Sequence, residues 1–342
     1  MIALNTSVEE AEKMLSEPTP QVIETLSKLD GDILILGVAG KMGPTLARMA
    51  KIAVDASGKK KKVIGVARFS KPAEQKKLEE WGIETVRCDL LDDGALKKLP
   101  DAPNIVYMAG MKFGSSGNEP LTWAMNTFLP GLVCQRFPHS RIAAFSTGNI
   151  YGLSPVVNGG SVETDPLNPI GDYAMSCLGR ERMFQHFSQA ASTRVSIIRL
   201  NYACELRYGV LVDLARKVWT GQPIDLAMGS FNVIWQADAN AMALASLAQA
   251  SSPAFILNVS GPEQLSVRRV CTQLAKRMGR DVNFVGAESP DALLNNGQMG
   301  HRLYGYPRVG AEEMMEMIAQ WVMAGAELLG KPTHFEARSG KF

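Results

Sequence analysis

The chain has 342 residues, of which 46% are hydrophobic and 20% are charged. This composition is that of a globular protein with a large core, and it excludes a disordered, collagen-like or coiled-coil chain. Lysine and arginine total 36 against 34 acidic residues, so the net charge is only +2 and a nucleic-acid partner is not expected.

The predicted elements begin with a short helical extension over residues 1–30. Ser7 to Glu10 fits a capping box, and Thr19-Pro20 fits an N-cap followed by proline. From Asp32 onward, short apolar strands alternate with helical stretches. The expected strands are Ile33–Leu36, Lys62–Arg68, Glu84–Cys88, Asn104–Met108, Arg141–Phe145 and Arg194–Leu200. Such alternation predicts an α/β fold with a Rossmann-type doubly wound parallel sheet.

A glycine-rich turn follows the first expected strand and opens a helix. Its sequence is Gly37-Val38-Ala39-Gly40-Lys41-Met42-Gly43. Glycines at this place permit a tight turn and let the backbone approach a pyrophosphate, which the N–H groups of the helix N-terminus then bind. The strand–turn–helix context makes this a predicted dinucleotide site rather than a flexible loop.

The end of the second strand bears on which dinucleotide is preferred. The segment Val66–Lys71 contains no acidic residue that would hold a ribose 2′-hydroxyl, but it contains Arg68 and Ser70, which suit a 2′-phosphate. We therefore expect NADP, with NAD as the alternative.

After Asn201 the strands thin out and helices with polar loops dominate. We expect an NAD(P)-binding Rossmann domain over residues 31–200, which also receives residues 232–258. A smaller, mixed α/β substrate lobe over 201–330 and a tail over 331–342 would follow.

The predicted location is cytoplasmic. No run of about 18 apolar residues is present to span a membrane, and acidic residues arrive too early for a secretory signal. The five cysteines are scattered, as in a protein with free thiols, and no cysteine–histidine spacing indicates a metal site.

Together with further motifs, these features resemble the extended short-chain dehydrogenase/reductase family of NAD(P)-dependent epimerases and dehydratases. The motifs are Asp89-Leu90, Ala109-Gly110-Met111-Lys112, Asn126, Ser146–Gly152, Glu163–Pro169 before Tyr173, Arg199-Leu200-Asn201, Asn258–Gly261 and Gly305-Tyr306-Pro307. The likeness covers roughly Asp32 to Val322.

The resemblance implies hydride transfer at a carbinol carbon, with Tyr173 as the base and Thr147 bonded to the same oxygen. The expected cofactor-binding residues are Gly37, Gly40, Lys41, Met42, Gly43, Arg68, Ser70, Asp89, Leu90, Ala109, Gly110, Lys112, Asn126 and Tyr173. The expected substrate-binding residues are Thr147, Asn149, Asn201, Tyr208 and Trp235. Tyr208 and Trp235 would stack on a sugar ring, although both also suit a core.

The first departure from the family is at the position four residues after Tyr173, where Cys177 replaces the lysine that lowers the tyrosine pKa. Four interpretations stay open. In the first two, Arg180 or Lys112 supplies the positive charge in place of the lysine. In the third, the site is catalytically silent. In the fourth, Cys177 acts as a nucleophile, although a buried inert thiol is the simpler explanation of this cysteine. We favour a working but altered site, because Thr147, Tyr173 and the glycine turn are all retained.

The second departure concerns the substrate. Phe231 stands where the family's nucleotide-sugar enzymes carry a diphosphate-binding arginine. We therefore expect a smaller sugar-like hydroxyl or keto compound and not a nucleotide-diphosphate sugar. The alternative function is a catalytically silent redox sensor or partner-binding protein. The resemblance also implies a homodimer through the helices that carry Asn126 and Tyr173.

Overall fold

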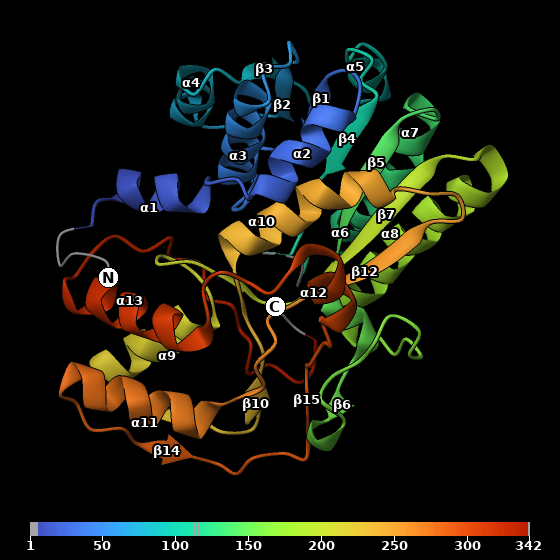
Figure 1. Ribbon diagram of the computed structural model, residues 1–342. Helices are drawn as coiled ribbons and strands as arrows, with labels where there is room; N and C mark the ends of the chain where they lie inside the picture. The colour runs from blue at the N-terminus through green and yellow to red at the C-terminus, as the bar shows by residue number, and fades with distance from the viewer. Residues whose placement is uncertain (1–5, 113, 115–116, 341–342) are drawn as a thin grey trace.

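The computed structural model describes residues 6–112, 114 and 117–340, and its larger lobe is built on a seven-stranded sheet (Figure 1). The strand order is β12-β7-β5-β4-β1-β2-β3, and every neighbouring pair is parallel. The strands are β1 (Ile33–Leu36), β2 (Val63–Ala67), β3 (Glu84–Arg87), β4 (Asn104–Tyr107), β5 (Arg141–Thr147), β7 (Arg194–Leu200) and β12 (Phe255–Val259). From β1 the strands β2 and β3 are added on one side, and β4, β5 and β7 on the other. The strand order therefore reverses between β1 and β4, and an open parallel sheet binds ligands at such a point.

Helices cover both faces of this sheet because its central strands are apolar on both sides. Ile33 and Ile35 of β1 join a hydrophobic cluster with helices α2 (Pro20–Lys28), α3 (Gly43–Ala56) and α10 (Gln236–Ala245). Leu34 and Leu36 point the other way, to a cluster with α7 (Leu129–Arg136) and α8 (Gly171–Ala191). The predicted doubly wound parallel α/β fold is confirmed.

The N-terminal segment packs onto the larger lobe through two capped helices, α1 (Val8–Leu15) and α2. Ser7 Oγ accepts from Glu10 N at 3.1 Å, and the Glu10 carboxylate accepts from Ser7 N at 2.6 Å, which is the predicted capping box. Thr19 caps α2 by accepting from Val22 N at 3.3 Å. These caps hold two short helices that are too small to be stable alone.

The smaller lobe gathers three helices, α9 (Val210–Trp219), α11 (Val267–Met278) and α13 (Ala311–Met323), at the lower left of Figure 1. Four two-stranded pairs accompany them. They are β8 (Ala203–Cys204) with β11 (Ile234–Trp235), β10 (Ser230–Phe231) with β13 (Leu265–Ser266), β9 (Ile224–Asp225) with β14 (Phe284–Val285), and β6 (Ser154–Pro155) with β15 (Asp291–Ala292). The remaining helices are α4 (Pro72–Glu80), α5 (Asp93–Lys97), α6 (Glu119–Trp123), the π-helical η1 (Ala124–Phe128), the 3₁₀-helical η2 (Gly148–Tyr151), η3 (Val156–Asn158) and η4 (Ser246–Gln249), and α12 (Gln298–Tyr304).

Strand ends differ from the sequence expectation by one or two residues. Strand β2 stops at Ala67 because Phe69, with φ of 48°, turns the chain in the left-handed region. Strand β5 extends to Thr147, two residues further than expected, since it pairs with β7 up to Leu200. No helix within the described part of the chain is long and apolar enough to cross a membrane.

Candidate active site

The glycine turn after β1 is shaped by close backbone approaches. Gly37 has φ of 88°, and a Cβ on it would lie 2.7 Å from the backbone nitrogen of Ala109. A Cβ on Gly43 would overlap the Val38 carbonyl oxygen. Helix α3 then begins at the turn without a side-chain cap, and Gly43 N donates to the Gly40 carbonyl at 3.2 Å. The turn therefore has the form of a pyrophosphate cradle.

One side of this turn opens into a cavity of about 270 Å³ at the carboxyl ends of β1 to β4. It is lined by the predicted cofactor residues Gly37, Gly40, Arg68, Ser70, Asp89, Leu90, Ala109 and Gly110. Arg68 and Ser70 are exposed, whereas Phe69 between them is buried. The Asp89 carboxylate accepts from Leu91 N at 3.1 Å and so holds the loop after β3. The structure thus brings these predicted cofactor residues together in one cavity, which we call the adenosine-side cavity after the part of the cofactor expected there.

Glu74 was not predicted but lines the same cavity. It lies in the first turn of α4, which follows the Arg68-to-Ser70 segment. A carboxylate there suits a ribose 2′-hydroxyl and opposes a 2′-phosphate. The sequence signal was present four residues after Ser70, beyond the segment where an acid is usually sought.

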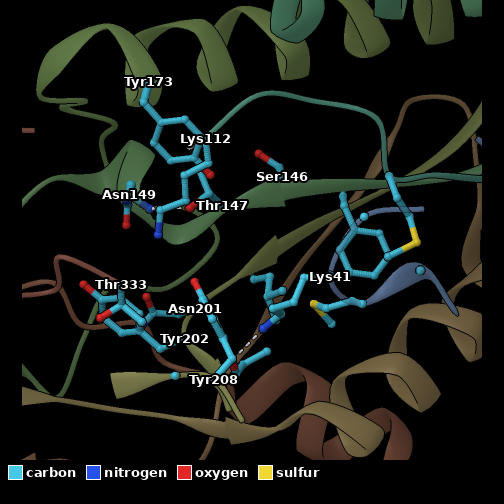
Figure 2. Close-up of a pocket in the computed structure, with 18 of the residues that line it drawn as sticks. Lys41, Lys112, Ser146, Thr147, Asn149, Tyr173, Asn201, Tyr202, Tyr208 and Thr333 are labelled. Atoms are coloured by element: carbon cyan, nitrogen blue, oxygen red, sulfur yellow. Dashed lines mark hydrogen bonds between the residues drawn. The ribbon is translucent and has the colours of Figure 1, made fainter. Parts of the chain in front are cut away.

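The other side of the turn opens into a second cavity, of about 230 Å³, between the two lobes (Figure 2). It shares Gly37, Gly40 and Met108 with the first cavity, so the two are continuous at the turn. Predicted residues in its wall are Gly37, Gly40, Lys41, Met42, Gly43, Lys112, Thr147, Asn149, Tyr173, Asn201 and Tyr208. Residues of the wall that were not predicted include the hydroxyl-bearing Ser146, Tyr202 and Thr333, which come from β5, the loop after β7 and the C-terminal segment.

Thr147 and Tyr173 lie together at the end of β5 and the start of α8. The Thr147 hydroxyl accepts from Asn149 N at 3.2 Å and is hydrogen-bonded to the Tyr173 phenol. Burial, mainly, raises the pKa of Tyr173 well above its usual range. A buried tyrosine needs a nearby cation to act as a base at neutral pH.

Cys177 lies one helical turn after Tyr173 and is fully buried. Its thiol is hydrogen-bonded to the Tyr173 phenol, and burial raises the pKa of Cys177 as well. A buried thiol with a raised pKa is a poor nucleophile.

Arg180 is held by hydrogen bonds to β5 and to Asn126. Its guanidinium donates to the Phe145 carbonyl at 2.8 Å and to Asn126 Oδ1 at 2.6 Å. Asn126 in turn accepts from Met111 N at 2.8 Å and donates to Met111 O at 2.9 Å. Asn126, expected to bind the cofactor, is fully buried and lines neither cavity, because its side chain holds the loop after β4.

Two lysines enter the cavity between the lobes. Lys112 places its ammonium 6.0 Å from the centre of the Tyr173 ring. Lys41 donates to the Ala203 carbonyl at 3.1 Å and lies 3.8 Å from the centre of the Tyr208 ring. Burial lowers the pKa of both lysines to about 8. Lys112 is therefore the lysine that approaches the tyrosine, as one of the sequence interpretations anticipated.

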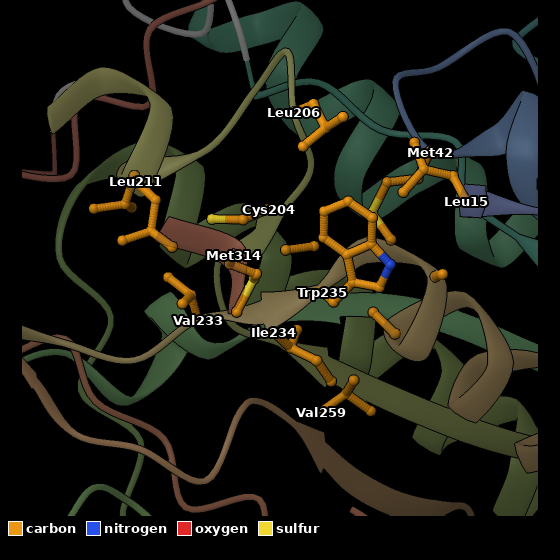
Figure 3. Close-up of a cluster of buried hydrophobic side chains, with 14 of the residues drawn as sticks. Leu15, Met42, Cys204, Leu206, Leu211, Val233, Ile234, Trp235, Val259 and Met314 are labelled. Atoms are coloured by element: carbon orange, nitrogen blue, oxygen red, sulfur yellow. The ribbon is translucent and has the colours of Figure 1, made fainter. Parts of the chain in front are cut away.

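Trp235 does not lie in the cavity wall. Only 2% of its surface is exposed, and it packs among Leu15, Met42 and Leu206 in a hydrophobic cluster that joins the two lobes (Figure 3). The expectation that Trp235 stacks on substrate is therefore corrected, because strand β11 points the indole inward. Of the two aromatic candidates, Tyr208 lines the cavity.

Asn201 and Asn232 form a polar contact behind the cavity, with Asn201 Nδ2 donating to Asn232 Oδ1 at 2.6 Å. Behind β5 and β7, Arg199 pairs with the buried Glu181 at 2.8 Å, and Glu181 accepts from Ser146 at 2.6 Å. These bonds fix the strand ends that carry Thr147 and Asn201. Phe231 is fully buried, with its ring 6.0 Å from that of Phe335.

Comparison with known proteins identifies a family and several solved structures with the same fold. The model of a family described as the NAD dependent epimerase/dehydratase family matches residues 33–207. No curated protein matches the sequence.

Solved structures with the same fold include MoeE5 in complex with UDP-glucose and NAD, with 18% identity, a TM-score of 0.67, and coverage of 86% of this chain and 99% of that one. A dTDP-glucose 4,6-dehydratase from Bacillus anthracis in complex with NAD has 16% identity and a TM-score of 0.71 over 85% of this chain and 96% of its own. A UDP-glucuronic acid 4-epimerase from Bacillus cereus, in complex with UDP-glucuronic acid and NAD, has 16% identity and a TM-score of 0.67 over 85% of this chain and 98% of its own.

Proposed function

Because this chain belongs to the NAD dependent epimerase/dehydratase family, we propose that it is an NAD(P)-dependent oxidoreductase or epimerase acting on a hydroxyl or keto carbon of a sugar-like substrate. The observation that carries the proposal is the cavity between the lobes. It brings the glycine turn, Thr147 and Tyr173 to one place.

The residues present fit a nicotinamide dinucleotide, since a Cβ at Gly37 or Gly43 would collide with the Ala109 or Val38 backbone, so the tight turn that approaches a pyrophosphate requires glycine there. When bound, the nicotinamide supplies a hydride acceptor or donor. Thr147 holds the substrate oxygen by its hydroxyl, and Tyr173 takes or returns the proton on that oxygen. Asn149 N fixes the Thr147 hydroxyl from behind.

Lys112 takes the place of the family lysine that Cys177 has replaced. Its ammonium faces the Tyr173 ring, and it comes from the loop after β4 instead of from α8. A positive charge near the ring favours the phenolate form of Tyr173. Arg180 contributes in the same direction from two turns along the helix.

For the cofactor, the finer proposal is a preference for NADP. Arg68 and Ser70 line the adenosine-side cavity at the position of a ribose 2′-substituent, and both are exposed to a ligand. Glu74 in the same cavity opposes a 2′-phosphate, and it gives the site tolerance for NAD.

For the substrate, we propose a free sugar, sugar acid or glycoside in place of a nucleotide-diphosphate sugar. Phe231, at the position of a diphosphate-binding arginine, is fully buried and offers no charge. Loss of a charge-assisted contact to a diphosphate costs about 1.5–3 kcal/mol.

One observation favours a second candidate, a dinucleotide-binding protein without turnover. Burial raises the pKa of Tyr173, and the residue one helical turn further on, which hydrogen-bonds to it, is the Cys177 thiol and not a lysine. Such a protein would bind cofactor and transfer no hydride.

We also propose that the protein is a homodimer and that it is cytoplasmic. Leu121, Trp123, Phe128 and Met175 expose between 38% and 59% of their surfaces on α6, η1 and α8, which supports a homodimer through these elements. Phe184 of α8 is fully buried in the core and does not belong to that face. All five cysteines are buried and free, which supports a reducing cytoplasmic compartment.

The experiment that tests the function begins with the protein as purified. Its bound cofactor is identified by absorbance and mass, and hydride transfer is followed at the nicotinamide absorbance band with free sugars, sugar acids, glycosides and nucleotide sugars. Turnover that depends on both Tyr173 and Thr147 supports the enzyme. Cofactor binding with no turnover on the whole panel supports the second candidate.

A further inference from the structure

The C-terminal segment, residues 331–340, contributes Thr333 to the wall of the cavity between the lobes. We call it the strap. We propose that the strap is the substrate-side wall of the site and limits the cavity to ligands smaller than a nucleotide sugar. This inference rests on the proposed function, since it concerns the substrate of the same cavity.

The first half of the strap is fixed to helix α9 of the small lobe. Thr333 donates to Asp213 Oδ2 through both its backbone N and its hydroxyl, each at 2.7 Å. Glu336 pairs with Lys217 at 2.9 Å. Between them, Phe335 is 1% exposed, with its ring 6.0 Å from that of Phe231. The buried Phe335 ring and the two hydrogen bonds that Thr333 donates to one carboxylate indicate that this part of the strap is fixed in place.

The second half of the strap binds the smaller lobe through Arg338 and reaches the larger lobe at Gly340. Arg338 donates to the Ala227 and Asp291 carbonyls at 3.2 and 3.1 Å, and it pairs with the Asp291 carboxylate. Gly340 lies against the turn before α8, where a Cβ would overlap the Ile170 carbonyl oxygen. Tyr173 follows that turn by three residues. The strap therefore contacts both lobes.

The strap also lines the space that a substrate would occupy. Thr333 is in the wall of the cavity that holds Thr147 and Tyr173. Ala337, Arg338 and Gly340 line a smaller adjoining space that shares Asn149 with it. At about 230 Å³, the main cavity must also hold the nicotinamide end of the cofactor, and it is below the ~300–1,000 Å³ of typical sites for drug-sized ligands.

Tyr202 marks the position of a ligand under the strap. Its hydroxyl is buried and has no hydrogen-bond partner among the described residues, although the residue lines the cavity. Its backbone is held at φ of 43°, an unfavourable region for a non-glycine residue. Figure 2 draws Tyr202 beside Thr333, so a small polyhydroxylated ligand would meet both hydroxyls there.

The test compares binding of UDP-glucose to the NAD-loaded protein by titration calorimetry. The variants are Phe335→Ala, Gly340→Ala and a chain that ends at Gly330. Gly330→Ala is the matched control, because Gly330 also has a positive φ, of 63°, but a Cβ there meets nothing within 4 Å. Acrylamide quenching of bound NADH fluorescence reports in each variant whether the cavity has opened.

We expect the three strap variants to bind UDP-glucose about tenfold or more tightly than the wild type, with stronger quenching, and Gly330→Ala to match the wild type. The proposal is overturned if the wild type binds UDP-glucose as tightly as the variants. It is equally overturned if quenching shows an open cavity and UDP-glucose binding does not improve. If the shortened chain loses NAD binding, the two point variants decide. Failure of the proposed function is a different result, since it is the absence of hydride transfer.

Discussion

The two halves of the site are built in different ways. The adenosine-side cavity is formed by short motifs that directly follow β1, β2, β3 and β4, and most of its lining residues were expected. The cavity between the lobes takes residues from the glycine turn, the loop after β4, β5, α8, the loop after β7 and the strap. Parallel strands bring their carboxyl ends to one edge in any chain of this fold, whereas the second set meets only because the two lobes pack as they do. The comparison indicates that cofactor binding is robust and that chemistry and substrate choice depend on long-range contacts.

The largest effect is expected at Tyr173. Tyr173→Phe removes the proton-exchanging hydroxyl and keeps the ring, so we expect turnover to fall by about 10²–10⁴-fold. Cofactor affinity, measured by NADH fluorescence titration, should stay near the wild-type value. Thr147→Ser, which keeps a hydroxyl, is the milder control. Unchanged turnover in Tyr173→Phe would show that the chemistry lies elsewhere.

In the cofactor half, Gly37→Ala should weaken NAD(P) binding by about 5- to 30-fold. The substitution places a Cβ against the Ala109 backbone and strains a residue at φ of 88°, at a cost of about 1–2 kcal/mol. Gly58→Ala is the control, because Gly58 also has positive φ, of 67°, and open space around it. Equal losses of binding in the two variants would mean that backbone strain alone, and not the cradle, is responsible.

The Lys112 ammonium should make turnover depend on pH. Burial lowers the pKa of Lys112 to about 8, so its ammonium loses charge as the pH rises through that value. Turnover that depends on this charge should decline above about pH 8. In Lys112→Met, turnover at pH 7 should be about tenfold lower, and the decline should be absent.

Lys41→Met is the matched control for that profile, because burial also lowers the pKa of Lys41 to about 8 while its ammonium lies at Tyr208 and the Ala203 carbonyl. The decline should persist in this variant. A decline that vanishes in Lys41→Met and remains in Lys112→Met would contradict the role given to Lys112.

A smaller effect is expected in the choice of dinucleotide. Arg68→Ala should weaken NADP relative to NAD by up to about fivefold, since an exposed ion pair contributes about 0–1 kcal/mol. Glu74→Gln should shift the ratio the other way, toward NADP. The measurement is the ratio of kcat/KM for the two cofactors. A ratio that neither variant changes would remove both residues from cofactor selection.

The smallest effect is expected at Cys177. Burial raises the pKa of this thiol, so it is not a nucleophile, and a thiol is a weak hydrogen-bond partner for Tyr173. Cys177→Ala should change turnover by less than about threefold. Iodoacetamide should leave native turnover intact. Abolished turnover in Cys177→Ala, with the fold retained, would revive the nucleophile hypothesis.

Most of the fold was predictable because its signals are local. The apolar runs in β1 and β4 have all four residues buried, as expected for strands covered on both faces. Strand ends were less predictable, since β5 extends to Thr147 only by pairing with β7. In the site, the residues that follow strands were found by their motifs. Trp235 was misplaced because the sequence does not show which face of β11 meets the core.

The sequence by itself determined the parallel α/β sheet, the glycine turn and the presence of Thr147 and Tyr173, because these depend on hydrophobic periodicity and on residues close together in the chain. It also showed that the lysine expected after Tyr173 is absent and that the net charge is only +2. The packing of the elements settled which lysine approaches the tyrosine, since Lys112 lies in the loop after β4 and Tyr173 lies in α8. It also brought Thr333 of the strap into the cavity wall, because a segment with no motif of its own is positioned by its contacts with Asp213, Phe231 and Asp291.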